Sequence, residues 1–100
     1  MKPIRFHPEA EAEMIAAAKY YENQQSHLGR RFLASVRESL AKIPFDPDLY
    51  PKIDSNTRRC LTRIFPYAIL YRVKDQSIEI LGVMHLHRKP NYWKQRLKSK

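Results

Sequence analysis

The spacing of hydrophobic residues changes once along this chain, and that change limits the fold more than any other feature. Between residues 10 and 43 the apolar side chains recur at steps of three and four, as on one face of a helix. Between residues 57 and 86 they alternate with polar ones, as in strands. Helices followed by a run of strands are typical of an α+β protein.

Two helices are expected before residue 44. Pro8 suits a first helical turn, and the acids that follow it favour the positive end of the helix dipole. The first helix should bury one face, formed by Ala10, Met14, Ala17, Ala18 and Tyr21. After the break "NQQSHLG", a second helix should bury Leu28, Phe32, Val36, Leu40 and Ile43 and end at Pro44. Such a short break predicts an antiparallel helical hairpin.

Four strands are expected around these helices. "PIRFH" is a short first strand; the later three are "TRRCLTRIF", ending at a turn at Phe65–Pro66, then "YAILYRV" and "IEILGVMHL". In the last strand, alternation puts Ile80 and Met84 on one face and Leu81 and Val83 on the other. Gly82 interrupts it and indicates a bulge or the close approach of another backbone.

The predicted architecture is one domain, residues 1–100, with element order β-α-α-β-β-β. A small, twisted, mostly antiparallel sheet carries the N-terminal helical hairpin on one face. The Pro- and Asp-rich loop "PFDPDLYPKIDSN" is not a domain boundary, because neither side of it could fold alone. We expect the opposite face of the sheet to be open.

The excess positive charge lies entirely in the second half of the chain. The formal net charge is +9. Residues 1–56 contain eight Lys or Arg and eight acids, whereas residues 57–100 contain eleven Lys or Arg and two acids. This asymmetry predicts a polyanionic partner, either nucleic acid or an acidic protein.

Several classes of protein are excluded by what the chain lacks. No apolar segment is long enough for a membrane span, and the N-terminus does not resemble a signal peptide. A single cysteine, Cys60, fits a reducing compartment, so we expect a cytoplasmic protein. Only two glycines are present, which excludes the glycine-rich phosphate loops of nucleotide-binding proteins. No cofactor is predicted.

The stretch "VMHLHRKPNYWKQR", residues 83–96, is the most informative for function. His85 and His87 fall on one side of the strand end, but a metal site needs a third ligand at suitable spacing, so no metal is predicted. Arg59, Leu61 and Arg63 share a face of an earlier strand. If that strand lies near Arg88, the open face of the sheet is lined with arginine.

Such a face suits either of two activities. Metal-independent RNA cleavage requires a base, an acid and cations around the phosphate, for which His85 or His87 and Arg63 or Arg88 are candidates. Tyr92 or Trp93 would stack on an unpaired base, although core packing is the simpler role for Trp93. The catalytic candidates, if the chain is a ribonuclease, are Arg63, His87, Arg88 and Tyr92. The candidates for contacting nucleic acid or a protein target are Arg58, Arg59, His85, Lys89, Trp93, Lys94 and Arg96.

Taken in order, these segments resemble the RelE/ParE superfamily of bacterial type II toxin–antitoxin toxins, also called plasmid stabilization proteins. The resemblance extends over nearly the whole chain and is carried by "EAEAEMIAAAKYYE", "LGRRFLASVRESLAKI", "RRCLTRIFPYAILYRV" and "IEILGVMHLHRKPNYW". It implies a growth-inhibiting toxin that a co-encoded antitoxin neutralises, in a hetero-oligomer or with a toxin homodimer.

The resemblance also implies two alternative targets. ParE-like members inhibit DNA gyrase, and RelE-like members cut mRNA on the ribosome. Arg88 falls on the RelE-like arginine after the last strand, but Ala68 stands where those toxins carry another arginine, and Leu61 interrupts the basic face. The helical hairpin and "FPYAILY" are more similar to ParE. Gyrase inhibition is therefore the first hypothesis, a metal-independent endoribonuclease the second, and an inactive binding module the third.

Overall fold

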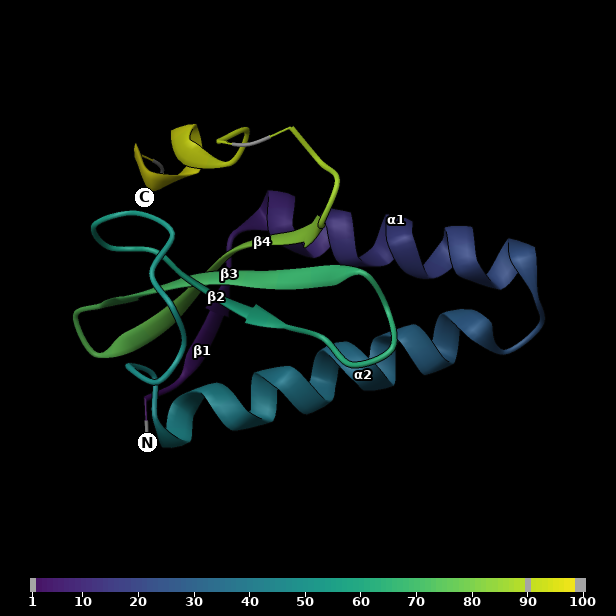
Figure 1. Cartoon of the computed structure of the whole chain (residues 1–100), viewed down its shortest axis with the longest axis horizontal. Coiled ribbons are helices and arrows are strands. Elements are labelled where there is room, and N and C mark those ends of the chain that lie inside the picture. Colours follow the sequence, from purple (N-terminus) through teal and green to yellow (C-terminus); the bar gives the residue numbers. More distant parts are fainter. Residues whose placement is uncertain (1, 90, 99–100) are drawn as a thin grey trace.

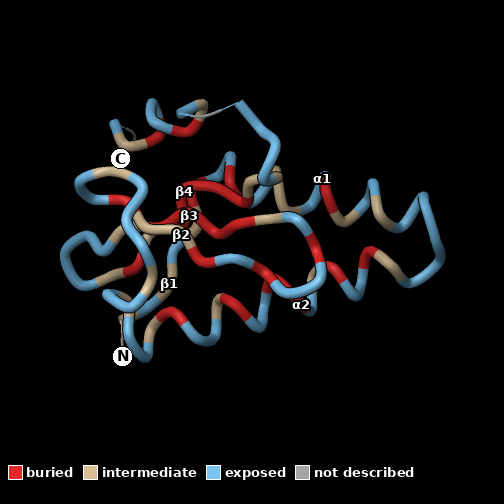
Figure 2. The backbone as a smooth tube through the Cα atoms, in the orientation of Figure 1, coloured by how far each residue is buried: buried red, intermediate tan, exposed pale blue. Residues whose placement is uncertain are grey.

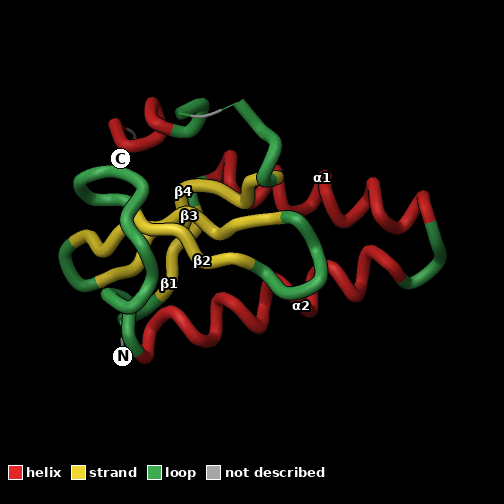
Figure 3. Tube along the Cα trace, in the orientation of Figure 1, coloured by secondary structure: helices red, strands yellow, loops and turns green. Residues whose placement is uncertain are grey.

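The computed structural model describes residues 2–89 and 91–98. Within this part the elements follow the predicted order, with two short 3-10 helices added (Figures 1 and 3). Their bounds are β1 Ile4–Phe6, α1 Pro8–Gln24, α2 Leu28–Lys42, η1 Ile43–Phe45, β2 Arg58–Leu61, β3 Tyr67–Lys74, β4 Ser77–His85 and η2 Lys94–Lys98. None of these helices has the length and apolar character needed to cross a bilayer.

The described strands form one sheet in the order β1-β4-β3-β2. β1 runs parallel to β4, and the other neighbours are antiparallel. The prediction of a mostly antiparallel sheet is therefore confirmed. β2 is shorter than expected, because it ends at Leu61 and leaves Arg63 in the turn that follows.

The helices form the predicted antiparallel hairpin, and one glycine sets how closely they approach. A Cβ atom on Gly29 would lie 2.4 Å from the carbonyl oxygen of Ala18 in the facing helix. The Glu22 carboxylate of α1 also accepts hydrogen bonds from the backbone N–H groups of His27 (2.9 Å) and Gly29 (3.0 Å). These bonds satisfy donors at the start of α2 and lower the pKa of Glu22.

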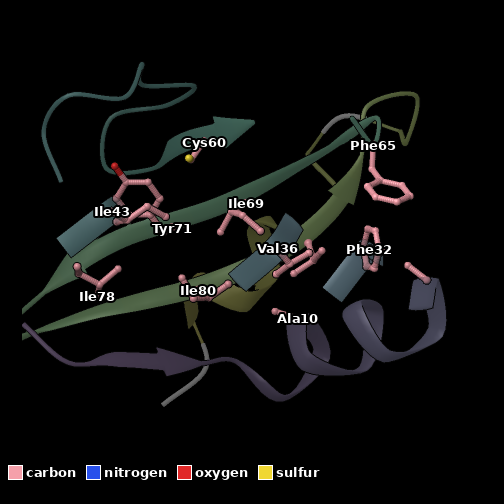
Figure 4. Packing of buried hydrophobic residues seen from close by; sticks show 12 residues of the cluster. Ala10, Phe32, Val36, Ile43, Cys60, Phe65, Ile69, Tyr71, Ile78 and Ile80 are labelled. Atoms are coloured by element: carbon pink, nitrogen blue, oxygen red, sulfur yellow. The ribbon is translucent and has the colours of Figure 1, made fainter. Parts of the chain in front are cut away.

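The main core lies between the hairpin and one face of the sheet (Figure 4). Buried positions are concentrated on the strands and on the inner faces of the helices (Figure 2). α2 contributes Phe32 and Val36, whose spacing of four residues puts both side chains on one helix face. Phe32 meets Phe65 and Tyr67 edge to face, with ring centroids 5.3 and 4.9 Å apart.

A bulge in β4 reverses the expected order of its side chains. Tyr71 pairs with Ile80 and Leu70 pairs with Gly82, so Leu81 is the extra residue. The bulge predicted from Gly82 is confirmed, but strict alternation through the strand was wrong. Because one extra residue turns the following side chains to the other face, Val83 joins the hairpin core.

The second face of the sheet is covered, not open as expected. Leu70 and Leu81 pack there against Trp93, which is 2% exposed, in a second cluster. The C-terminal segment 91–98, yellow in Figure 1, lies on the side of the sheet away from α2. Because the C-terminal segment covers this face, the expected arginine-lined surface is limited to the edge of that segment.

Candidate functional site

The candidate site lies where β4 ends and the chain turns back towards the C-terminal segment. The backbone N–H of Arg88 donates to the carbonyl oxygen of His85 at 2.9 Å, which reverses the chain after the strand. Asn91 has a φ of 68°, a conformation that asparagine tolerates better than most residues. The guanidinium carbon of Arg88 consequently lies 3.9 Å from the centre of the Tyr92 ring, in a cation–π contact.

A buried ion pair between Arg96 and Glu13 lies next to this cation–π contact. Arg96 donates to both carboxylate oxygens of Glu13, each at 2.9 Å, and to the carbonyl oxygen of Leu81 at 2.9 Å. The Arg96 side chain is 6% exposed and that of Glu13 is 16% exposed. Glu13 also accepts the backbone N–H of Val83 at 3.0 Å. The pair thus ties α1, β4 and the C-terminal segment together.

Two guanidinium groups lie close to the Tyr92 ring. The guanidinium carbon of Arg96 lies 4.9 Å from the ring centre. Nη1 of Arg88 lies 3.9 Å from Oε2 of Glu13. Burial, and next the neighbouring Glu13 carboxylate, raise the pKa of Tyr92. This environment makes the phenol harder to deprotonate than an ordinary tyrosine.

Arg59 and Arg88, whose proximity the sequence left as a condition, lie near each other in the structure. Both line a hollow of about 350 Å³, together with Met84, Leu86 and Trp93. The Nε atom of Arg59 is buried and has no hydrogen-bond partner among the described residues. The hollow thus combines apolar walls with two cationic side chains.

Arg63 does not join this group. It lies in the turn after β2, with its side chain 69% exposed and 3.5 Å from Glu38 of α2. Arg63 therefore faces the hairpin side of the sheet, whereas Arg88 stacks on the C-terminal segment. The distribution separates two of the cations that RNA cleavage would need together.

The two histidines lie next to each other. Their ring centroids are 5.3 Å apart, and the backbone N–H of His87 donates to Nδ1 of His85 at 3.1 Å. Nδ1 of His85 is thereby occupied as an acceptor. Within residues 2–89 and 91–98, no group of three or more His, Cys, Asp or Glu is arranged to hold a metal ion.

The remaining candidates divide between surface and interior. Lys89 is exposed, and Lys94 pairs with Asp54 at 3.4 Å. Arg58 donates to the carbonyl oxygen of Tyr50 at 2.7 Å, and so helps to hold the loop before β2. Trp93 and Arg96 were expected to contact a target, but both are buried. For Trp93, the alternative of core packing is confirmed.

Sequence reasoning missed Glu13, although a signal was present. Glu13 lies three residues after Ala10 and four before Ala17, the positions that form the buried face of α1. A carboxylate on an apolar helix face requires a buried partner. Its partner Arg96 is 83 positions away, so the sequence indicated the need for a pair without identifying it.

Comparisons with known proteins identify the family of this chain. Residues 4–90 match the family model described as ParE toxin of type II toxin–antitoxin system, parDE. Two relatives named Toxin ParE2, from the CDC 1551/Oshkosh and H37Rv strains of Mycobacterium tuberculosis, are each 28% identical over 89 residues. Each alignment covers 88% of this chain and 85% of the relative.

A solved structure shows the same fold. It is described as the chromosomal ParDE TA system from P. aeruginosa, with a TM-score of 0.64 and 17% identity. The match covers 87% of this chain and 98% of the other. Since the family model spans most of the chain, the resemblance found in the sequence is confirmed: this protein belongs to the ParE toxin family of type II toxin–antitoxin systems.

Proposed function

We propose that this toxin inhibits DNA gyrase in the cytoplasm by binding it, with no chemical step of its own. As a type II toxin the chain pairs with an antitoxin, and we propose that this pairing blocks the contact with gyrase. The observation that carries the proposal is the separation of Arg63, which pairs with Glu38 of α2, from Arg88, which stacks on Tyr92 of the C-terminal segment. These residues do not converge on one phosphate, as in-line RNA cleavage would require.

The hollow beside Arg88 supports docking to a protein. Leu86 and Ile53 are 40% and 39% exposed at its margin, next to Arg59 and Arg88. Apolar side chains interspersed with arginine are typical of protein interfaces. Arg88 is held in position by Tyr92, so binding a partner would cost it little conformational entropy.

The direct test is a DNA supercoiling assay with purified gyrase. Wild-type toxin should inhibit supercoiling, and equimolar antitoxin should relieve the inhibition. Arg88→Ala should raise the toxin concentration needed for half inhibition by about 5- to 30-fold, as expected for an interface arginine. Arg5→Ala is the charge-matched control, because Arg5 is exposed on β1 at the opposite edge of the sheet from β2. Full supercoiling in the presence of wild-type toxin would reject the proposal.

One observation favours a second candidate, the ribosome-dependent endoribonuclease. Arg59 and Arg88 share a hollow, and Arg88 also lines a neighbouring hollow with His85, whose ring adjoins that of His87. A purified translation system distinguishes this candidate, because it would show cleaved mRNA and arrested synthesis. In that case Arg88→Ala should abolish cleavage and leave antitoxin binding intact.

A further inference from the structure

The turn between β2 and β3, residues 62–66, contains a strained residue. Ile64 has a φ of 75°, and the backbone N–H of Phe65 donates to the carbonyl oxygen of Arg63 at 2.8 Å. This hydrogen bond closes a γ-turn centred on Ile64, and the form with positive φ is rare and strained. A β-branched residue is among the least suited to that backbone.

The fold requires the turn but does not require isoleucine in it. Thr62 Oγ1 donates to the carbonyl oxygen of Phe65 at 3.0 Å, and Ser35 Oγ donates to that of Arg63 at 2.6 Å. These bonds hold the backbone and direct Phe65 into the aromatic core. The Ile64 side chain is 80% exposed, so it adds almost nothing to that core.

A polar or glycine residue would therefore serve the fold better at position 64. Asparagine and glycine adopt positive φ at little cost, and neither would expose an aliphatic side chain. Strain that the surrounding structure maintains is concentrated at functional positions. An exposed isoleucine in such a conformation thus points to a contact outside this chain.

The surroundings of Ile64 indicate the chemistry of that contact. A hollow of about 310 Å³ is lined by residues of both the turn and α2, with Ala34 and Phe65 as apolar walls and Arg31 and Arg63 among its lining residues. Arg31 is exposed, and Arg63 has only an exposed ion pair with Glu38, which costs little to break. The surface complements a segment that carries apolar and acidic side chains together.

We propose that this turn is an anchor for the antitoxin. Ile64 packs against apolar side chains of an acidic antitoxin segment, whose carboxylates pair with Arg31 and Arg63. The antitoxin is the occupant because family membership establishes it as a partner and because the two arginines favour an acidic chain. The proposal is independent of whether gyrase or the ribosome is the target.

The test compares Ile64→Asn with wild-type toxin in two measurements. Because asparagine adopts positive φ more readily than a β-branched residue, the variant's melting temperature should rise by about 2–6 °C. Its affinity for purified cognate antitoxin, measured by titration calorimetry, should fall at least about tenfold, as for the loss of an interface anchor. Arg63→Gln should weaken the same affinity about 3- to 10-fold with little change in melting temperature.

The matched control is Leu49→Asn. Leu49 is 66% exposed in the loop before β2 and does not have positive φ, so the change removes an exposed leucine without relieving strain. Its antitoxin affinity should stay within twofold of wild type. Ile64→Gly provides a second variant at the turn, with the same expected loss of affinity.

Three results would overturn the proposal. Unchanged antitoxin affinity in both Ile64 variants would show that the turn is not an anchor. A lowered melting temperature in Ile64→Asn would refute the strain on which the inference depends. If the Ile64 variants keep their antitoxin affinity but no longer inhibit gyrase, the turn contacts the target and not the antitoxin. Failure of the wild-type toxin to inhibit gyrase would reject only the function proposed above.

Discussion

Arg96 should be the residue on which the C-terminal segment depends most. Arg96→Met keeps much of the aliphatic length of the side chain but removes the guanidinium group. The change removes three hydrogen bonds, two to Glu13 and one to the carbonyl oxygen of Leu81. It also removes one of the two cations that lie close to the Tyr92 ring.

The expected magnitude follows from the burial of the pair. Removing one partner of a buried ion pair costs about 3–5 kcal/mol. Glu13 keeps the hydrogen bond from Val83 N–H and the nearby Arg88, and its side chain is 16% exposed, so part of the cost is recovered. We therefore expect a loss of about 2–4 kcal/mol in the free energy of unfolding. In a domain of this size that corresponds to about 10–25 °C in melting temperature.

Urea unfolding of a double-mutant cycle measures the interaction itself. Arg96→Met, Glu13→Gln and the double variant should give a coupling energy of about 1.5–3 kcal/mol. The exposed pair between Arg63 and Glu38, treated in the same way, should give less than about 0.5 kcal/mol. A loss below about 1 kcal/mol for Arg96→Met, or additive costs in the cycle, would refute the role given to the buried pair.

Two further predictions concern packing and pH. Gly29→Ala should lower the free energy of unfolding by about 2 kcal/mol or more, because the added Cβ would lie 2.4 Å from the carbonyl oxygen of Ala18. Gly82→Ala should change the free energy of unfolding by less than about 1 kcal/mol, because its added Cβ would lie 3.4 Å from the nearest atom. Equal costs in urea unfolding would contradict this difference. Burial raises the pKa of Tyr71, so its contribution to stability is complete below about pH 10 and is lost as the pH rises further. Tyr71→Phe should reduce the alkaline slope of unfolding free energy by up to about 1.4 kcal/mol per pH unit, and an unchanged slope between about pH 10 and 12 would be evidence against the shift.

The helices and strands could be predicted because their signals are local. The spacing of Phe32 and Val36 reflects one buried helix face, and the break before Leu28 leaves room only for a hairpin. The bulge near Gly82 also had a local signal. Its position could not be fixed, because both Leu81 and Val83 are apolar and either could be the extra residue.

The cover on the second sheet face could not be predicted from local patterns. Trp93 and Leu97 belong to a short, basic segment whose sequence is typical of a solvated tail. Its docking depends on Arg96 meeting Glu13, a contact between opposite ends of the sequence. The strained γ-turn at Ile64 was missed for a related reason, because isoleucine is a residue that turn preferences argue against.

The separation of Arg63 from Arg88 has a simple physical origin. Arg63 was expected on the same face as Arg59 in a strand that continued to residue 65. β2 ends at Leu61 instead, where Ser39 Oγ of α2 donates to the Leu61 carbonyl oxygen at 3.3 Å. The chain then turns towards the helical hairpin, so Arg63 lies next to Glu38 of α2.

Pulse-labelling of DNA and protein synthesis after induction of the toxin without antitoxin tests the proposed function most directly. If the toxin acts on gyrase, DNA synthesis should fall within minutes while translation continues, and antitoxin co-expression should restore it. An early collapse of protein synthesis with DNA synthesis still running would contradict gyrase inhibition and identify the ribosome as the target. Undiminished synthesis of both, with normal growth, would contradict it as well and leave a binding module without toxicity.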